Sequence, residues 1–395
     1  MTRKPKAKTR KAPRPTPPAL AQGRDEAHRL LNSGQIQAAT AFCQKILKRW
    51  PDDTFTLMVL ALSIANTGDL GAAAEVMESA VAIDSRSAQA RDILGSLYHR
   101  QGRIDDAIAA FRTAIELDPT RPNAYSNLAG ALNDIGDFVG AEAAFGRAVE
   151  LRPNYAMAVS NYICAMNFVP DISDQDLFDV HRDYQHRIGA EALDLARPLA
   201  NAPEPERTLK IGYVSADFGH HPVGFLLRPV IENHDRARFQ PFLYSDRVLE
   251  DEMTGRFKRS ARAWRQIAGK SAAEVAAQIR RDGIDILVDL AGHTGHNRLP
   301  VFAARPAPVQ VSWIGYVHTT GLDAMDYVLM DETTVPPGAE RWFSETLIRL
   351  PGGRFCYQPP DFAPPVAPPP IAQRGHATFG SFNNARKITA EVARV

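Results

Sequence analysis

The first 167 residues show the spacing of amphipathic helices. In the segment 104–117, the apolar residues Ala107, Ile108, Phe111 and Ala114 fall on one helical face, with charged residues between them. Beyond residue 207 the pattern changes to short apolar runs that alternate with helical segments. The chain therefore divides into an all-helical part and an α/β part.

The helical part is built from a repeat of 34 residues. Glycines, alanines and helix-ending residues recur in three registers over four copies: Gly34, Gly68, Gly102, Gly136; Ala39, Ala73, Ala107, Ala141; Pro51, Ser85, Pro119, Pro153. We expect two short helices per copy, with the glycine at the turn, the alanine in a close helix contact and the proline after the second helix. This pattern resembles the tetratricopeptide repeat, from about residue 24 to 154, with one more helix over 155–167.

Two asparagines sit at equivalent positions of the last two repeats. Asn127 and Asn161 are 34 residues apart, whereas the same position earlier holds Ile93 and Val59. A side-chain amide on the inner face of a solenoid can bond to the backbone of an extended peptide. The alternative is that both amides only bond neighbouring helices.

The second part has the pattern of a mostly parallel sheet. Strands are predicted over 209–215, 239–245, 284–290, 309–315 and 327–330, with an amphipathic helix over 272–281. A parallel sheet of this kind binds ligands at the carboxyl ends of its strands. The loops that follow the strands are therefore the candidate site.

Five of the eleven histidines fall in three such loops. His220 and His221 follow the first strand, His293 and His296 follow the strand over 284–290, and His318 follows the next one. An imidazole in such a loop can act as a base or bind an anion. We expect a polar rim around an active site, although each histidine alone could be structural.

Composition narrows the function further. The chain has 395 residues, a net charge of +1 and three cysteines far apart in sequence, which disfavours a nucleic-acid-binding protein, a disulfide scaffold and a zinc site. No apolar run is long enough to cross a membrane, and no signal peptide is evident, so we expect a cytoplasmic location. Residues 1–23 contain seven basic side chains within the first 18 positions and are predicted to be a disordered tail whose partner is unknown. Asp174 and Asp176 are predicted to be a solvated helix start, not a metal site.

Several strings together resemble one family. They are Ile211-Gly212-Tyr213-Val214-Ser215-Ala216-Asp217-Phe218 with His221-Pro222, Asp282-Gly283-Ile284-Asp285 with Gly292-His293-Thr294, Arg305-Pro306-Ala307-Pro308-Val309-Gln310, and Phe382-Asn383-Asn384-Ala385-Arg386-Lys387. The chain resembles the protein O-linked N-acetylglucosamine transferase family, which includes SPINDLY-like proteins. The resemblance implies a two-lobed glycosyltransferase of the GT-B type, in which two Rossmann-like halves hold a nucleotide sugar without a metal.

The resemblance also implies roles for individual residues. Transfer would run from UDP-N-acetylglucosamine to serine or threonine hydroxyls, with His221 as the catalytic histidine. The family's positions for nucleotide-sugar binding fall on His293, Thr294, Asn384 and Lys387, and those for acceptor proteins on Asn127 and Asn161. Lys387 would neutralise the diphosphate leaving group. SPINDLY-like members use a fucose donor instead, which leaves the donor sugar open.

The expected organisation ends early in the second lobe. We predict a tail (1–23), repeats (24–167), a helical connector (168–207), a first catalytic lobe (208–358), a Pro-rich hinge (359–376) and the start of a second lobe (377–395). Because most of the second lobe is missing from this sequence, a non-catalytic protein-binding scaffold is the alternative to an enzyme. Val317-His318 also stands where many family members have Pro-Gly, so a different loop shape is expected there.

Overall fold

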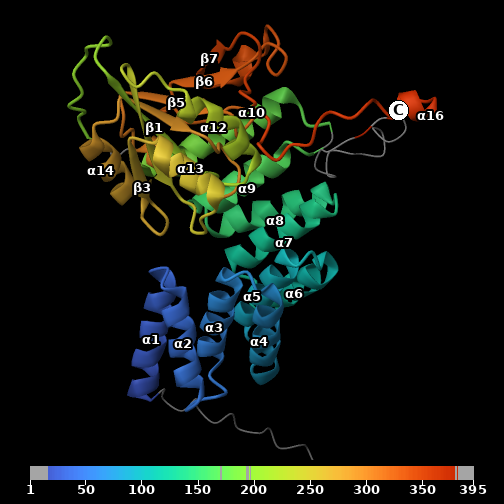
Figure 1. Ribbon diagram of the computed structural model, residues 1–395. Helices are drawn as coiled ribbons and strands as arrows, with labels where there is room; N and C mark the ends of the chain where they lie inside the picture. Colours follow the sequence, from blue (N-terminus) through green and yellow to red (C-terminus); the bar gives the residue numbers. More distant parts are fainter. Residues whose placement is uncertain (1–16, 170, 193–194, 196, 379, 381–395) are drawn as a thin grey trace, which may run out of the picture. The chain divides into compact units, whose positions relative to one another are not determined.

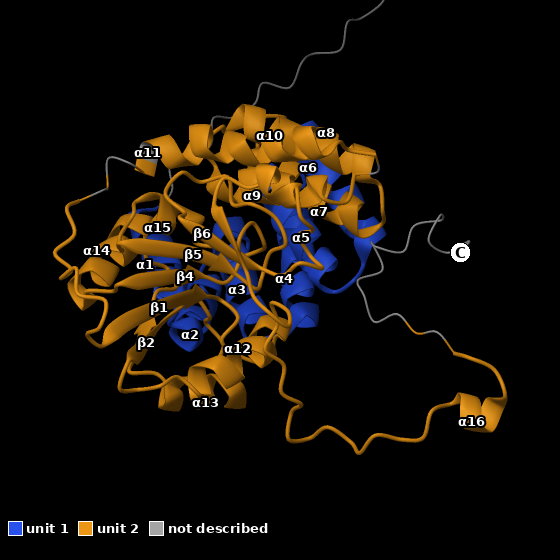
Figure 2. Cartoon of the chain, turned by 90° about the horizontal axis from the view of Figure 1, so that it is seen from above, with its two compact units in different colours: residues 1–117 blue, residues 118–395 orange. Residues whose placement is uncertain are grey.

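The computed structural model describes residues 17–169, 171–192, 195, 197–378 and 380. The chain forms two compact units, residues 1–117 and residues 118–395 (Figures 1 and 2). Each unit is described separately below.

The first unit consists of paired antiparallel helices. Its elements are α1 (Pro18–Asn32), α2 (Ile36–Leu47), α3 (Thr54–Asn66), α4 (Leu70–Ile83), α5 (Ala88–Arg100) and α6 (Ile104–Leu117). The first helix begins at Pro18, ahead of the predicted repeat start at residue 24, because a proline is well tolerated at the first helical position. Asp53, Asp69 and Ser87 cap the following helices through backbone N–H groups.

The repeat registers have the predicted structural roles. The four glycines at the turns have positive φ angles between 74° and 96°, which a side chain with a Cβ adopts only at a cost. Ala39, Ala73 and Ala107 are completely buried between helices. The second helix of each pair ends before Pro51, Ser85, Pro119 or Pro153, as the spacing predicts.

The second unit starts with helices and continues into a sheet. The helices are α7 (Pro122–Asp134), α8 (Phe138–Leu151), α9 (Ala156–Met166), α10 (Asp174–Tyr184), the π-helix η1 (Gln185–Gly189) and α11 (Ala190–Ala192). Val149 of α8 and Val159 and Ile163 of α9 belong to the same apolar core as strand residues Val214 and Leu287. The compact units therefore divide at residue 117, within the predicted repeats (24–167), because the last helices bury their apolar faces with the α/β part.

The sheet is parallel throughout its seven strands. They are β1 (Leu209–Ser215), β2 (Phe239–Ser245), β3 (Ala263–Gln266), β4 (Ile286–Asp289), β5 (Val309–Trp313), β6 (Tyr327–Met330) and β7 (Thr346–Arg349). The strand order is β3-β2-β1-β4-β5-β6-β7. The five predicted strands are confirmed, although β4 and β5 are shorter than expected. β3 and β7 were not predicted because neither has a buried apolar run.

Helices cover both faces of the sheet (Figure 2). One face packs against α12 (Pro222–Glu232) and α13 (Glu252–Ser260), through residues such as Leu227, Phe257 and Trp313. The other face packs against α14 (Ala272–Asp282), α15 (Leu299–Ala303) and α9. This three-layer arrangement is the doubly wound α/β fold that the sequence predicts.

The end of the described chain is largely exposed. After η3 (Ala339–Trp342) and β7, the Pro-rich stretch contains only the short helix α16 (Ile371–Arg374). Most of the predicted start of the second lobe, residues 377–395, lies outside the described residues. Over the part of the chain that the structure describes, no helix is both long and apolar enough to cross a membrane.

Candidate active site at the carboxyl edge of the sheet

The strand order reverses direction between β1 and β4. The chain runs from β1 outward to β2 and β3, then returns to β4 on the other side of β1. At such a point the loops after the two strands diverge and leave a crevice at the carboxyl edge. The loops after β1 and β4 contain four of the five histidines that the sequence singled out.

His221 lies at the start of α12, directly after the loop that follows β1. Its Nδ1 accepts a hydrogen bond from the Val223 N–H at 3.3 Å and so caps the helix. The side chain is 43% exposed, so its Nε2 edge is available to a ligand. Gly224 allows this close turn, because a Cβ there would lie 2.2 Å from the Gly219 carbonyl oxygen.

Asp217 is the carboxylate next to this histidine. Its Oδ2 lies 3.5 Å from the His221 Nδ1. Burial raises the pKa of Asp217, while the positive charges of His221, His296 and Arg247 act in the opposite direction. Asp217 belongs to one of the family motifs, but no role was predicted for it from the sequence.

A buried carboxylate holds the loop after β4. Asp289 accepts hydrogen bonds from the Gly292 N–H at 2.7 Å, the Ala291 N–H at 3.2 Å and the Ser312 hydroxyl at 3.3 Å. Burial raises the pKa of Asp289 to about 6 despite these bonds. The loop is thereby fixed to the end of the strand. Thr294 then donates its hydroxyl to the Ala291 carbonyl at 2.7 Å.

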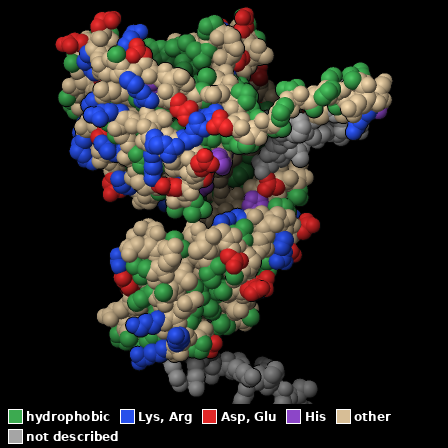
Figure 3. Space-filling view, viewed as in Figure 1, with side chains coloured by type: hydrophobic (Ala, Val, Ile, Leu, Met, Phe, Trp, Pro, Cys, Tyr) green, Lys and Arg blue, Asp and Glu red, His purple; other side chains and the backbone are tan. Residues whose placement is uncertain are grey.

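A cavity of about 320 Å³ lies beside this loop. It is lined by Ala156, Met157, Asn161, Asp246, Ala272, Thr294, Gly295, His296, Asn297, Arg298, Pro300 and Val301. Several parts of the chain therefore meet here: the last repeat helix α9, the residue that follows β2, the start of α14, and the loop after β4 with α15. On the face drawn in Figure 3, Lys and Arg side chains gather over the region of α13 and α14, and histidines reach the surface nearby.

Arg298 fixes one wall of the cavity. Its guanidinium pairs with Asp246 and donates to the carbonyl oxygens of Ile267 at 3.0 Å and Lys270 at 2.9 Å. These bonds tie the loop after β4 to the segment between β3 and α14. Neither Asp246 nor Arg298 was predicted from the sequence to have a role, although Asp246 directly follows a predicted strand, and this placement could have identified it.

The five loop histidines do not form one rim, which corrects the expectation from the sequence. His220, His221 and His296 are at the surface, whereas His293 is fully buried and His318 is half-buried. His318 stacks on His181 of α10 at 4.4 Å and on Phe343 at 5.3 Å between ring centroids. Through His181, the helical connector thus covers His293 and His318.

His293 has both ring nitrogens engaged inside the protein. Its Nε2 donates to the Thr320 carbonyl at 2.9 Å, so its Nδ1 accepts from the Ser160 hydroxyl at 3.1 Å. In this arrangement the imidazole has no exposed surface from which to contact a nucleotide sugar. It instead joins α9 to the two loops.

The other predicted binding residues have different positions. Asn161 and Thr294 line the same cavity, whereas Asn127 lies half-buried on α7 and does not line it. Asn384 and Lys387 lie outside the described residues. Within the described ranges, no cluster of three or more histidine, cysteine or acidic side chains is arranged to hold a metal ion.

Fold and site together define a class of protein: helical repeats followed by a doubly wound domain with a cavity at the carboxyl edge of its sheet. Residues 195–358 match the family profile of glycosyl transferase family 41, and residues 24–88 and 95–136 match tetratricopeptide repeat profiles. The chain thus contains a region that matches glycosyl transferase family 41 and helices that match tetratricopeptide repeats, an arrangement similar to that of O-GlcNAc transferase and SPINDLY proteins.

Individual relatives agree with this assignment. A Petunia hybrida protein described as a probable UDP-N-acetylglucosamine–peptide N-acetylglucosaminyltransferase SPINDLY is 40% identical over 232 residues, which is 58% of this chain and 25% of that protein. The UDP-N-acetylglucosamine–peptide N-acetylglucosaminyltransferase of Caenorhabditis elegans is 36% identical over 149 residues, which is 36% of this chain and 13% of that protein.

Among solved structures, a mutant O-GlcNAc transferase of Thermobaculum terrenum is similar with a TM-score of 0.68 and 32% identity, over 88% of this chain and 60% of that one. The chain spans about a quarter of the length of the SPINDLY proteins that it matches.

Proposed function

We propose that this protein is a glycosyltransferase that moves N-acetylglucosamine from UDP-N-acetylglucosamine to serine or threonine hydroxyls of protein acceptors. The observation that carries the proposal is the cavity in which Asn161 of the last repeat helix meets Thr294 and His296 of the sheet domain. A helix of the repeats, the region proposed to bind acceptor proteins, thereby contributes to the lining of the proposed reaction site. The family 41 match and the printed activity of the relatives support the same reaction.

His221 is proposed to act on the acceptor hydroxyl through Nε2. While Nδ1 accepts the Val223 N–H, a neutral His221 carries its proton on Nε2 and is a hydrogen-bond donor. If Nδ1 is protonated it faces the Asp217 carboxylate, 3.5 Å away, and Nε2 becomes free to accept a proton. Asp217 is therefore proposed to favour the form of His221 that works as a base.

The remaining binding roles follow the family resemblance. Thr294 is proposed to contact the nucleotide sugar, and Asn161 with Asn127 the backbone of the acceptor. Lys387 is proposed to neutralise the diphosphate, with Asn384 beside it. His293 is proposed to support this subsite by fixing its loop, since its own side chain is covered.

The test is a transfer assay with the purified chain, UDP-N-acetylglucosamine and a cell lysate as acceptor. His221→Asn retains an oxygen that can cap α12 but removes Nε2, so we expect the variant to fold and its turnover to fall about 10²–10⁴-fold. His221→Ala should lower turnover to the same extent. His220→Ala is the matched control, because His220 is the exposed neighbour and stacks on Phe225. Unchanged turnover in His221→Asn contradicts the role of His221.

Donor competition decides between the sugars. Inhibition by UDP but not by GDP supports N-acetylglucosamine, and the reverse supports a fucose donor. A folded chain that transfers neither sugar contradicts the enzyme proposal and favours a protein-binding scaffold. We also propose that transfer needs no metal, which predicts full activity in EDTA. The protein is proposed to be cytoplasmic, and cell fractionation tests that location.

A further inference from the structure

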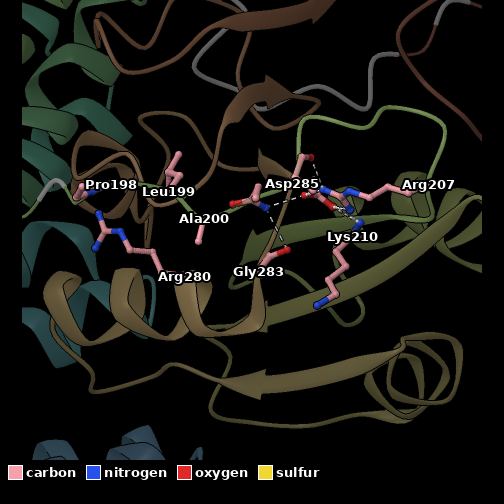
Figure 4. Close-up of a pocket in the computed structure, with 10 residues that line it drawn as sticks. Pro198, Leu199, Ala200, Arg207, Lys210, Arg280, Gly283 and Asp285 are labelled. Atoms are coloured by element: carbon pink, nitrogen blue, oxygen red, sulfur yellow. Dashed lines mark hydrogen bonds and ion pairs between the residues drawn. The ribbon is translucent and has the colours of Figure 1, made fainter.

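A second cavity lies at the opposite edge of the sheet. Its volume is about 360 Å³, and it is lined by Pro198, Leu199, Ala200, Asn201, Ala202, Arg207, Lys210, Arg280, Gly283 and Asp285. Figure 4 shows Arg280 reaching from α14 toward Pro198 at one end, while Arg207, Lys210 and Asp285 lie together at the other. The linker before β1 forms the wall between them.

The one carboxylate that lines this cavity is already saturated. Asp285 accepts from the Arg207 Nη1 at 2.8 Å, the Asn201 Nδ2 at 2.6 Å and the Lys210 N–H at 2.9 Å. Its negative charge is therefore compensated by Arg207, and little of it is left for the other cations.

Arg280 and Lys210 have only neutral partners in the part of the chain that the structure describes. Arg280 donates Nη2 to the Ala304 carbonyl at 2.6 Å, and its buried Nε–H has no partner. Lys210 donates Nζ to the Asp282 carbonyl at 2.8 Å. Burial, and to a smaller extent Arg197, lowers the pKa of Arg280, as expected for a cation that lacks a counter-charge.

We propose that this cavity binds a small organic phosphate monoester, with the phosphate at Arg280. Three cations line the cavity against one carboxylate, and Arg207 compensates that carboxylate at the other end, so the positive charge of Arg280 is left for a phosphate group. A guanidinium edge with a free N–H is suited to phosphate oxygens. The volume is in the range of small-molecule sites, and Pro198, Leu199 and Ala200 offer an apolar wall to the organic part.

This site is distinct from the candidate active site. The two sites lie at opposite edges of the sheet: Lys210 is at the start of β1, whereas Asp217 follows its end, about 20 Å further along the strand. α14 runs between them, with Ala272 lining the active-site cavity and Arg280 lining this one. A ligand bound here therefore does not occupy the active-site cavity.

The test uses phenyl phosphate as the probe and titration calorimetry with the full chain. We expect saturable binding with a dissociation constant on the order of 1 mM or tighter. Arg280→Met should weaken binding at least tenfold. Because this variant also loses the bond to Ala304, a second variant, Ala200→Glu, adds a negative charge to the exposed linker without touching the core and should weaken binding equally.

The matched control is Arg281→Met. Arg281 is the next residue on α14, is exposed and bonds only to Gln278, so its loss should leave binding unchanged. Saturating UDP should not displace the probe. The proposal would be overturned if the probe shows no saturable binding, or if UDP displaces it. It would also be overturned if Arg280→Met and Ala200→Glu bind the probe as tightly as the wild type does.

Discussion

Acidification should destabilise the second unit through its buried histidines. His181, His293 and His318 are in mutual contact, and each uses one ring nitrogen as an acceptor. The Tyr316 hydroxyl donates to His181 at 2.8 Å, the Ser160 hydroxyl to His293 at 3.1 Å, and the Thr319 N–H to His318 at 2.9 Å. Protonation would place a second donor against each of these donors.

The pKa values of these three histidines are lowered, as expected if protonation disrupts their hydrogen bonds. Burial lowers the pKa of His293 to about 3 and of His318 to about 4, and lowers that of His181 well below 6.5. The unfolded chain binds these three protons near pH 6.5. Their contribution to stability is therefore complete above pH 6.5 and is lost as the pH falls toward 4.

One carboxyl group, that of Asp289, changes the stability in the opposite direction as the pH falls. Asp289, with its pKa raised to about 6, takes up a proton in the folded state before the unfolded chain does, which stabilises the fold as the pH falls. His234, with a lowered pKa, and Asp217, with a raised one, oppose each other in the same way. Unfolding between pH 5.5 and 4.5 thus binds about two net protons, and the free energy of unfolding falls by about 3 kcal/mol per pH unit.

The assay is urea unfolding followed by tryptophan fluorescence at several pH values. A Trp50→Phe background leaves Trp264, Trp313 and Trp342, which all report on the second unit. His318→Phe can keep the stack with His181 and Phe343 but cannot titrate, so the slope should fall to about 1.4 kcal/mol per pH unit. His376→Gln, in the exposed Pro-rich segment, is the control. The same slope in His318→Phe as in the wild type would refute the reasoning.

Three further predictions concern the repeats. Asn127→Ala with Asn161→Ala should raise KM for protein acceptors and leave KM for short peptides unchanged, since each lost amide bond contributes about 0.5–1.5 kcal/mol; equal effects on both substrates contradict the binding role. Gly136→Ala should lower the free energy of unfolding by about 1 kcal/mol because its φ is +80°, whereas Gly146→Ala inside α8, where a Cβ has open space, should raise it; urea unfolding distinguishes the two. Ala107→Leu should cost about 1–3 kcal/mol, because Ala107 is completely buried in the helix contact, and an unchanged melting temperature would contradict close packing there.

The sequence by itself determined the local architecture. The 34-residue period placed the turn glycines and the buried alanines, because each acts through its own backbone or its immediate neighbours in the repeat. The apolar runs identified the five strands with buried side chains, and the carboxyl-edge rule identified the loops that carry His221 and Thr294. Motif resemblance then indicated the family.

Only the tertiary structure decided which loop side chains remain accessible. His293 and His221 look alike in sequence, since each follows a strand in a glycine-containing loop. α9 and α10 cover His293, through Ser160 and the ring of His181, whereas the side chain of His221 is 43% exposed.

The two cavities also depend on the tertiary structure. Asp246, Arg298 and Asn161 are far apart in sequence and meet only because α9 packs on the sheet. Among the described residues Arg280 has no carboxylate partner, and Asp285, which lines the same cavity, pairs with Arg207. Burial and charge compensation depend on all elements that surround a residue, so a one-dimensional pattern determines the elements but not the environment of each side chain.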